Sequence, residues 1–174
     1  MKYQIKNRQH FVSRQSGAVL MVSMIMLLLL SIIGVTGSQV TSLEEKMAGN
    51  SYDQNIAFQA AEEALRSGEQ VIDALGNLTA FTTGINNAAG QFSPAQRPDY
   101  TAGNTWTNTS AQTTNVIPLV ATQPRYFIHY IGNQPSDPLD PSSDPISMFR
   151  IVARGTGRQN TTQVFLQAFY GKIF

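Results

Sequence analysis

The sequence contains no cysteine. That absence excludes disulfide bonds, thiol catalysis and cysteine-ligated metal sites, so an exported domain of this chain must be held together by its core alone. Histidine is almost as scarce, since His10 and His129 are the only two. We expect His129 to be a half-buried, hydrogen-bonded strand residue, because no Ser, His and Asp set for nucleophilic catalysis can be assembled around it. The composition therefore argues against an enzyme.

Charge is missing from a long stretch of the chain. No charged residue lies between Arg14 and Glu44, and the residues before that stretch carry only positive charges. Because positive residues favour the cytoplasmic side of a membrane, the part of the chain after the stretch is predicted to cross it. Residues 44–174 carry eight Lys or Arg and eleven Asp or Glu, a net charge of −3. They contain no basic stripe, so direct binding of nucleic acid is not expected.

The uncharged stretch contains an apolar segment, residues 18–40, that is long enough for a bilayer, which takes about 20 residues. It begins directly after Gly17, whereas a secretory signal peptide has its small-residue cleavage site after the apolar region. A cut after Gly17 would make Ala18 the new N-terminus and keep the apolar segment on the mature protein. Gly34 and Gly37, three residues apart, either permit close helix packing or loosen the helix where it leaves the membrane.

The helical pattern continues past the apolar segment. Apolar residues recur at spacings of three and four as far as Leu75, and Gly76 is a plausible stop. One helix over 18–75 would be about 87 Å long at about 1.5 Å per residue, too long for a compact domain of this size to bury. Its first half therefore belongs in lipid or in a bundle of similar helices. In its second half, Ala60, Ala61 and Ala64 are predicted to lie under a sheet, with Glu63 in solvent.

The C-terminal part has the alternation and β-branched content of strands. The predicted strands are 126–131, 148–154 and 161–170, the last two forming a hairpin. The fold class is therefore α+β, in which a long N-terminal helix, transmembrane in its first half, packs by its second half on a small antiparallel sheet. The predicted organisation is a leader at 1–17, a transmembrane and assembly helix at 18–42, and a periplasmic head domain at 43–174.

Two segments have no clear periodicity. Residues 76–123 are predicted to be a long loop with one short strand at 116–120, and residues 133–147, with four prolines, an irregular loop. The second loop carries three aspartates that are candidate partner-binding residues, since recognition concentrates on loops: Asp137, Asp140 and Asp144. Their oxygens are also of the type that calcium binds, but an ordinary polar loop explains them better, and no other cofactor is expected.

The N-terminal region resembles the PilX-type minor pilins of the type IV pilin-like superfamily. The similarity lies in QSGAVLMVSMIMLLLLSIIGVTGSQ, followed by LEEKMAGNSYDQNIAFQAAEEALRSGE, which together span residues 15–69. RIVARGTG, residues 150–157, also resembles a hairpin of that family. The resemblance implies cleavage after Gly17 by a prepilin peptidase and methylation of the new amine of Ala18. Major pilins generally carry a glutamate at the fifth mature position, where this chain has Val22.

The resemblance implies a minor pilin that primes type IV pilus assembly at or near the tip. Its implied partners are other minor pilins, the major pilin and a PilY-family tip adhesin, with roles in twitching motility, adhesion and DNA uptake. Its implied location is the inner membrane, single-pass with a periplasmic head, and then the pilus tip at the cell surface. Two alternatives remain. A tip pseudopilin of type II secretion also fits the helix and the absent glutamate, and a membrane-anchored periplasmic enzyme or binding protein would lack the Gly17 cleavage.

Overall fold

The computed structural model describes residues 17–82, 90–106, 112–113 and 116–174. These residues belong to two compact units, which divide between Met47 and Ala48. The first unit is the exposed N-terminal part of one helix. The second contains the rest of that helix and all the strands that the structure describes, so it is the part of the chain that builds a core.

Helix α1 (Ala18–Ala74) has 57 residues and confirms the predicted long helix. Its buried positions all lie in the second unit and are small except for one isoleucine: Ala57, Ala60, Ala61, Ala64, Gly68 and Ile72. Glu63 is exposed, as predicted. At the end of the helix, the Lys172 Nζ donates hydrogen bonds to the carbonyls of Ile72, Asp73 and Leu75 at 3.0, 2.7 and 2.8 Å. A cation on the last carbonyls satisfies groups that a helix end leaves open.

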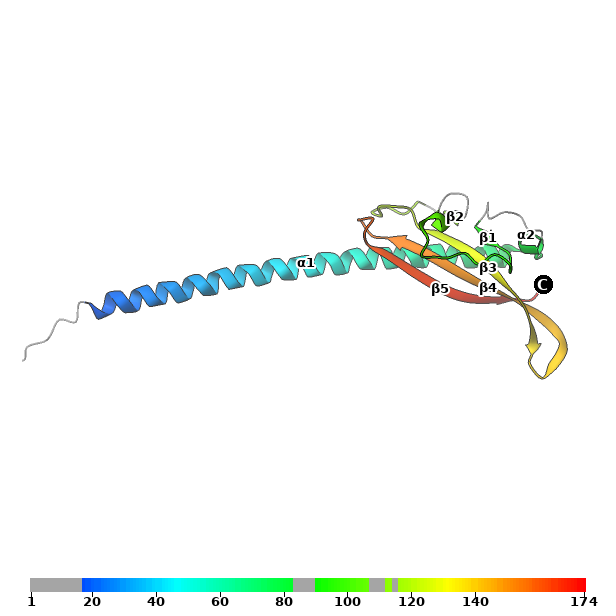
Figure 1. Ribbon diagram of the computed structural model, residues 1–174, viewed down its shortest axis with the longest axis horizontal. Helices are drawn as coiled ribbons and strands as arrows, with labels where there is room; N and C mark the ends of the chain where they lie inside the picture. Colours follow the sequence, from blue (N-terminus) through cyan, green and yellow to red (C-terminus); the bar gives the residue numbers. More distant parts are fainter. Residues whose placement is uncertain (1–16, 83–89, 107–111, 114–115) are drawn as a thin grey trace, which may run out of the picture. The chain divides into compact units, whose positions relative to one another are not determined.

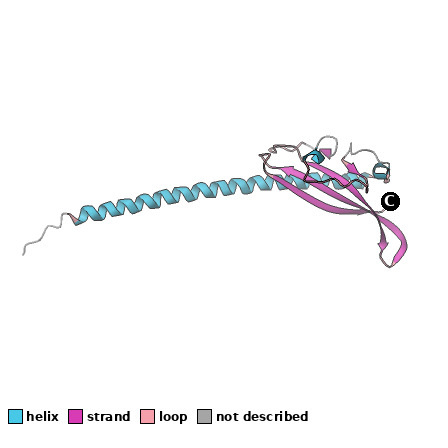
Figure 2. Ribbon diagram, in the orientation of Figure 1, coloured by secondary structure: helices cyan, strands magenta, loops and turns pink. Residues whose placement is uncertain are grey.

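Three antiparallel strands form most of the sheet: β3 (Arg125–Asp137), β4 (Asp140–Thr156) and β5 (Gln163–Lys172). The sheet order is β1-β3-β4-β5, in which β1 (Gln91–Phe92) runs parallel to β3, and β2 (Gln112–Thr113) also pairs with β3. Figure 2 shows the helix and strands of this α+β fold. The predicted hairpin near the C-terminal end is confirmed as β4 and β5, with β5 at the edge of the sheet.

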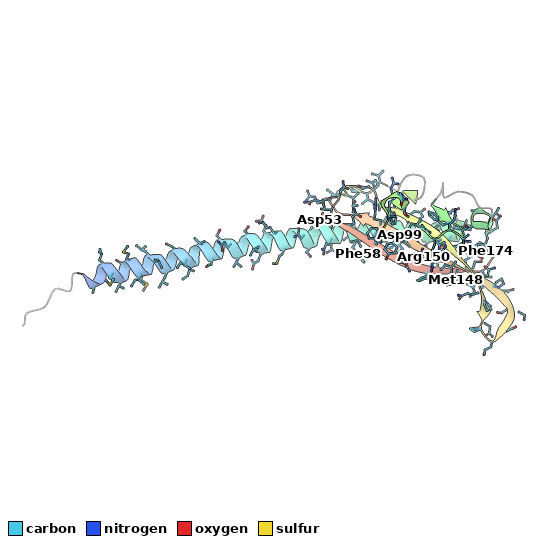
Figure 3. The ribbon with its side chains drawn as sticks, in the orientation of Figure 1. Asp53, Phe58, Asp99, Met148, Arg150 and Phe174 are labelled. Atoms are coloured by element: carbon cyan, nitrogen blue, oxygen red, sulfur yellow. The ribbon has the colours of Figure 1, made fainter. Side chains whose placement is uncertain are left out.

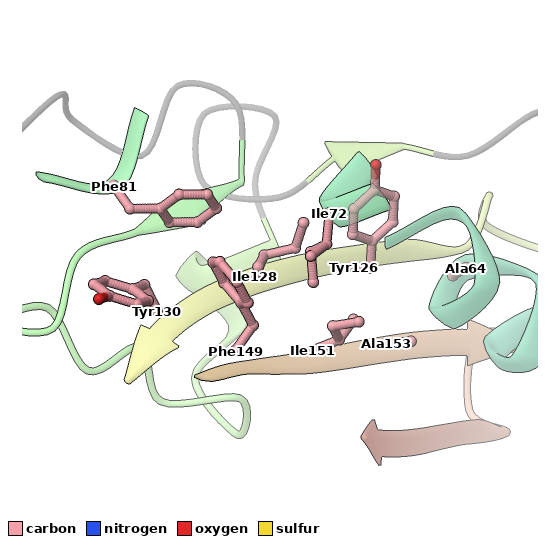
Figure 4. Close-up of a cluster of buried hydrophobic side chains, with 9 residues drawn as sticks. All are labelled: Ala64, Ile72, Phe81, Tyr126, Ile128, Tyr130, Phe149, Ile151 and Ala153. Atoms are coloured by element: carbon pink, nitrogen blue, oxygen red, sulfur yellow. The ribbon is translucent and has the colours of Figure 1, made fainter. Parts of the chain in front are cut away.

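The inner face of the sheet packs on α1 and on the short helix α2 (Thr79–Thr82). Phe81 of α2 contacts Tyr130 and Phe149, with ring centroids 6.2 and 5.2 Å apart (Figure 4). Farther along, the backbones come very close. A Cβ on Gly155 would lie 2.1 Å from the Ala57 carbonyl oxygen and 2.4 Å from the Ala61 nitrogen. Alanine on the helix and glycine on β4 are therefore what allows α1 to lie directly on the sheet.

The outer face of the sheet carries a second, smaller core. Phe92 and Trp106, the latter at the end of the 3₁₀ helix η1 (Gly103–Trp106), pack on Phe127 and Val152. Trp106 is held by its Nε1, which donates a 2.7 Å hydrogen bond to the Tyr100 carbonyl. The segment 90–106, predicted to be a loop, is thus an aromatic layer that covers part of the sheet.

Two predictions of local structure were wrong, one of a strand and one of a loop. Residues 116–120 form no strand, because the Gln123 side chain hydrogen-bonds both the N–H and the carbonyl of Ile117, and Leu119 adopts a left-handed φ of 68°. Residues 133–147 are not an irregular loop but the outer part of the β3–β4 hairpin. Pro135 and Pro145 face each other there. Prolines are tolerated in a two-stranded ribbon, because both strands are edge strands.

Candidate functional site

The first candidate site is the apolar half of α1. Ala18 is the first helical residue, directly after Gly17, and Val22 is 57% exposed. In the described part of the chain, α1 is the one helix long and apolar enough to cross a membrane. Its hydroxyls do not disturb that character, since Ser31 donates to the Leu27 carbonyl at 2.7 Å and Thr36 likewise bonds the preceding turn. The apolar half is therefore suited to lipid or to a helical bundle.

The glycines of this segment have open space where a side chain would project. A Cβ added at Gly34 or Gly37 would meet nothing within 4 Å. Gly155, by contrast, is needed for packing within the head. Gly34 and Gly37 thus leave a small-residue surface on the helix, of the kind that allows another helix to approach closely.

The start of the head is pinned by Asp53. Its carboxylate accepts a 2.6 Å hydrogen bond from the Arg158 backbone N–H. A hydrogen bond from the Thr162 side chain is the main reason that the pKa of Asp53 lies below its ordinary value. A Cβ on Gly157 would lie 2.6 Å from the same carboxyl group. The turn between β4 and β5 is therefore fastened to α1 at a position that the sequence did not single out (Figure 3).

The aspartates of the hairpin are engaged locally. Asp137 accepts a hydrogen bond from the Leu139 N–H at 2.9 Å, and Asp140 accepts bonds from the N–H and hydroxyl of Ser142 at 2.9 and 2.5 Å. Asp144 is exposed on β4, four residues after Asp140. Among the described residues, no three His, Cys, Asp or Glu side chains form a group that could hold a metal. Asp137 and Asp140 thus shape the hairpin tip.

The tip itself is exposed and bent away from the head. Leu139 is 93% exposed. The register between β3 and β4 shifts at Gly132, whose φ of 139° favours glycine, and again before Asp137. Figure 1 shows the outer part of this hairpin twisting away from the rest of the sheet. An apolar side chain on a projecting ribbon is a candidate contact for another protein.

His129 lies on the outer face beside Arg150, its register partner on β4. It is 6% exposed. Among the described residues its ring nitrogens have no partner with full hydrogen-bond geometry, yet the backbone of Pro94 and Ser93 interacts with the ring and favours its protonation, so the expected hydrogen bonding is at most weak. Burial, then the charge of Arg150, lower the pKa of His129, which keeps the ring neutral near pH 7. The charged groups that act on it are the cations Arg150 and Arg97. The charged neighbours that act on His129 therefore include no carboxylate of the kind that orients the histidine of a Ser-His-Asp triad.

Comparison with known families covers both halves of the chain. Residues 16–66 match the family described as PilX N-terminal, and residues 79–172 match Type IV pilus assembly protein PilX C-term, which alone spans more than half of the sequence.

The chain belongs to the PilX family of type IV pilus assembly proteins.

The resemblance seen in the N-terminal region is thereby confirmed, and it extends to residues 79–172 of the head. No curated protein and no solved structure matches the chain. PilX-family membership makes the chain a type IV pilus minor pilin, a structural component that works with other components of the pilus. The apolar half of α1 accords with membrane anchoring of such a subunit.

Proposed function

We propose that this PilX-family minor pilin primes pilus assembly at or near the tip. The observation that carries the proposal is Val22, exposed on a helix that has no carboxylate before Glu44. In major pilins the glutamate at this position is thought to pair with the N-terminal amine of a neighbouring subunit. A subunit without it makes no such pair, so it is suited to a position that needs none.

Maturation follows from the junction at Gly17. A prepilin peptidase cuts after Gly17 and methylates the amine of Ala18, so that the helix begins at the new N-terminus. Before assembly the subunit sits in the inner membrane, single-pass, with its head in the periplasm. Its apolar segment then leaves lipid for the helical bundle of the pilus. That transfer is feasible because bundle and bilayer are similarly apolar, so helix packing decides the outcome.

The head supplies the partner contacts. We assign the outer hairpin, residues 133–147, to the contact with another minor pilin, the major pilin or a PilY-family tip adhesin, because it projects and exposes Leu139. Through these contacts the subunit supports twitching motility, adhesion and DNA uptake. A tip pseudopilin of type II secretion would share the helix and Val22. The match of the head to the PilX C-terminal family favours the pilus.

Stoichiometry and the Val22→Glu variant test the proposal. In sheared pili, quantitative mass spectrometry should find this subunit scarce relative to the major pilin, while its deletion should reduce piliation. Val22→Glu adds a carboxylate that costs about 3 kcal/mol in a membrane helix and has no paired amine at the tip, so function should fall or stay unchanged. Val22→Leu is the matched control and should be neutral. Pili built mainly from this subunit would contradict the tip assignment.

A further inference from the structure

The outer edge of β5 is unusually open for an edge strand. β5 pairs with β4 over ten residues with no bulge, and it ends the sheet order (Figure 1). Folded proteins protect such edges with proline, bulges or charges, since the unpaired N–H and carbonyl groups can pair with another chain. β5 has no proline, and its one charged residue, Lys172, points to the end of α1. Phe165 and Phe169 are 39% and 61% exposed.

A groove of about 580 Å³ runs beside this edge on the helix side of the sheet. One wall is formed by Ser51, Gln54, Asn55 and Phe58 of α1, and the other by residues 161–164. Phe58 is 45% exposed although it lies in the second unit, where α1 packs on the sheet (Figure 3). All of these lining residues are uncharged.

A smaller pocket of about 140 Å³ lies next to the same stretch of β5, lined by Tyr100, Val152 and residues 165–167. Its aromatic walls are fixed, because the rings of Tyr100 and Trp106 lie 6.0 and 5.7 Å from that of Phe165. The pocket lining is again uncharged. Along residues 161–167, the edge is therefore flanked by a polar groove and by an aromatic pocket.

We propose that the β5 edge accepts an extended segment of another protein chain as an added strand. Successive side chains of a strand point to opposite faces. A strand paired with β5 would therefore direct alternate residues to the two sides, toward the groove and toward the pocket. In this recognition mode main-chain hydrogen bonds supply affinity and alternate pockets supply selectivity. The matching segment is uncharged, with small or polar residues on the groove side and an apolar residue on the pocket side.

The donor is a different protein rather than a second copy. Two identical β5 edges would pair about a twofold axis, to which each copy contributes the same strand. The two strands would then be antiparallel. The two α1 helices would then run in opposite directions. Copies anchored in one membrane carry α1 in the same direction, so they cannot pair in this way. This step rests on the proposed membrane anchoring, whereas the strand-accepting edge does not.

The test uses full-length protein in detergent micelles and a labelled, uncharged decapeptide, TVTVTVTVTV, in which polar residues for the groove alternate with apolar residues for the pocket. Two further peptides carry N-methyl groups on alternate residues. One is methylated at its odd-numbered amides and the other at its even-numbered amides. Only one set of amides can face the acceptor edge. The parent should bind saturably, one methylated peptide should bind at least about tenfold more weakly, and the other should bind like the parent.

Variants of the protein locate the site. Phe165→Lys and Gln167→Lys should each weaken the parent peptide about tenfold by placing a charge beside an uncharged pocket. Val116→Lys, at a side chain 85% exposed and away from β5, is the matched control and should bind normally. Circular dichroism checks that each variant is folded. Phe165→Lys also removes the ring contacts of Phe165, so Gln167→Lys serves as a second variant in which those contacts are kept.

Three results would overturn the inference. They are no saturable binding of the parent, equal binding of both methylated peptides, and unchanged binding to both lysine variants. If instead the protein alone forms dimers that Gln167→Lys dissociates, the occupant is a second copy. None of these results bears on membership of the PilX family, which rests on the sequence matches, or on tip placement, which pilus composition tests.

Discussion

Gly155→Ala is the sharpest test of how the head is held together. The added Cβ would sit 2.1 Å from the Ala57 carbonyl oxygen and 2.4 Å from the Ala61 nitrogen. Both are backbone atoms of α1, so no side chain can turn aside. Ordinary contacts to such atoms are longer than about 3 Å, which means that the helix must lift from the sheet by about 1 Å.

The expected cost is large for a single methyl group. Overpacking a rigid core costs about 1–3 kcal/mol, and here the strain falls on two backbones, so we expect about 3 kcal/mol. For a head of this size that corresponds to a drop in Tm of about 10 °C. The measurement is thermal unfolding of the full-length protein in detergent, followed by circular dichroism in the near ultraviolet, where the aromatic core is the signal.

Gly76→Ala is the matched control. Gly76 follows α1, and a Cβ there meets nothing within 4 Å. Its Tm should change by no more than about 2 °C, since surface substitutions are usually within about 0.5 kcal/mol. If Gly155→Ala and Gly76→Ala had the same Tm, α1 would not rest on β4 as described.

Three further predictions concern processing, burial and acid stability. Gly17→Glu should leave the precursor uncut, because the peptidase must admit a residue with almost no side chain; an unchanged mature mass would refute the cleavage site. Ala61→Glu should bury an unpaired carboxyl and cost several kcal/mol, whereas Glu63→Ala, on the exposed face, should cost less than about 0.5 kcal/mol. The pKa of Asp53 is lowered by folding, so its contribution is present above about pH 4 and is lost as pH falls through the folded value. Asp53→Asn should therefore flatten the acid side of the stability–pH curve, and an unchanged curve would refute the role of its hydrogen bonds.

The hairpin prediction separates folding from binding. Replacement of residues 133–147 by a short Gly/Ser linker should leave the head folded by circular dichroism, because these residues add little to the core. The same change should weaken pull-down of the neighbouring minor pilin or the tip adhesin. Normal binding by the shortened protein would move the interface elsewhere, with the β5 edge as the next candidate.

The elements with strong periodicity were predictable. The 3.6-residue pattern identified α1 and placed Ala60, Ala61 and Ala64 on its buried face, and two-residue alternation identified the main strands. These signals are local, because each residue's burial follows from its own position in the repeat. The junction at Gly17 was equally local, although its cleavage remains a prediction.

The errors arose where long-range contacts decide the structure. Prolines at 135 and 145 indicate a loop, yet they face each other in paired strands. This is possible because neither strand has a second neighbouring strand there that would need an N–H from the proline position. Residues 116–120 have the composition of a strand, yet the Gln123 side chain hydrogen-bonds the N–H and the carbonyl of Ile117. Sequence periodicity carries no signal for such a side-chain contact six residues away. The aromatic layer over 90–106 could not be foreseen, because Trp106 is buried only once Phe127 and Val152 are beneath it. The open edge of β5 likewise depends on its place in the sheet.

The contact of Lys172 with α1 has a consequence for the order of folding during export. The ammonium group that satisfies the last carbonyls of the helix comes from β5, about 100 residues later in the chain. If the head crosses the membrane from its N-terminal end, as proposed above, the end of α1 emerges long before its terminal cation arrives. Until then the helix end is frayed and β4 is itself an exposed edge. The head should thus acquire protease resistance in one late step, when β5 has crossed, which makes resistance a readout of complete export.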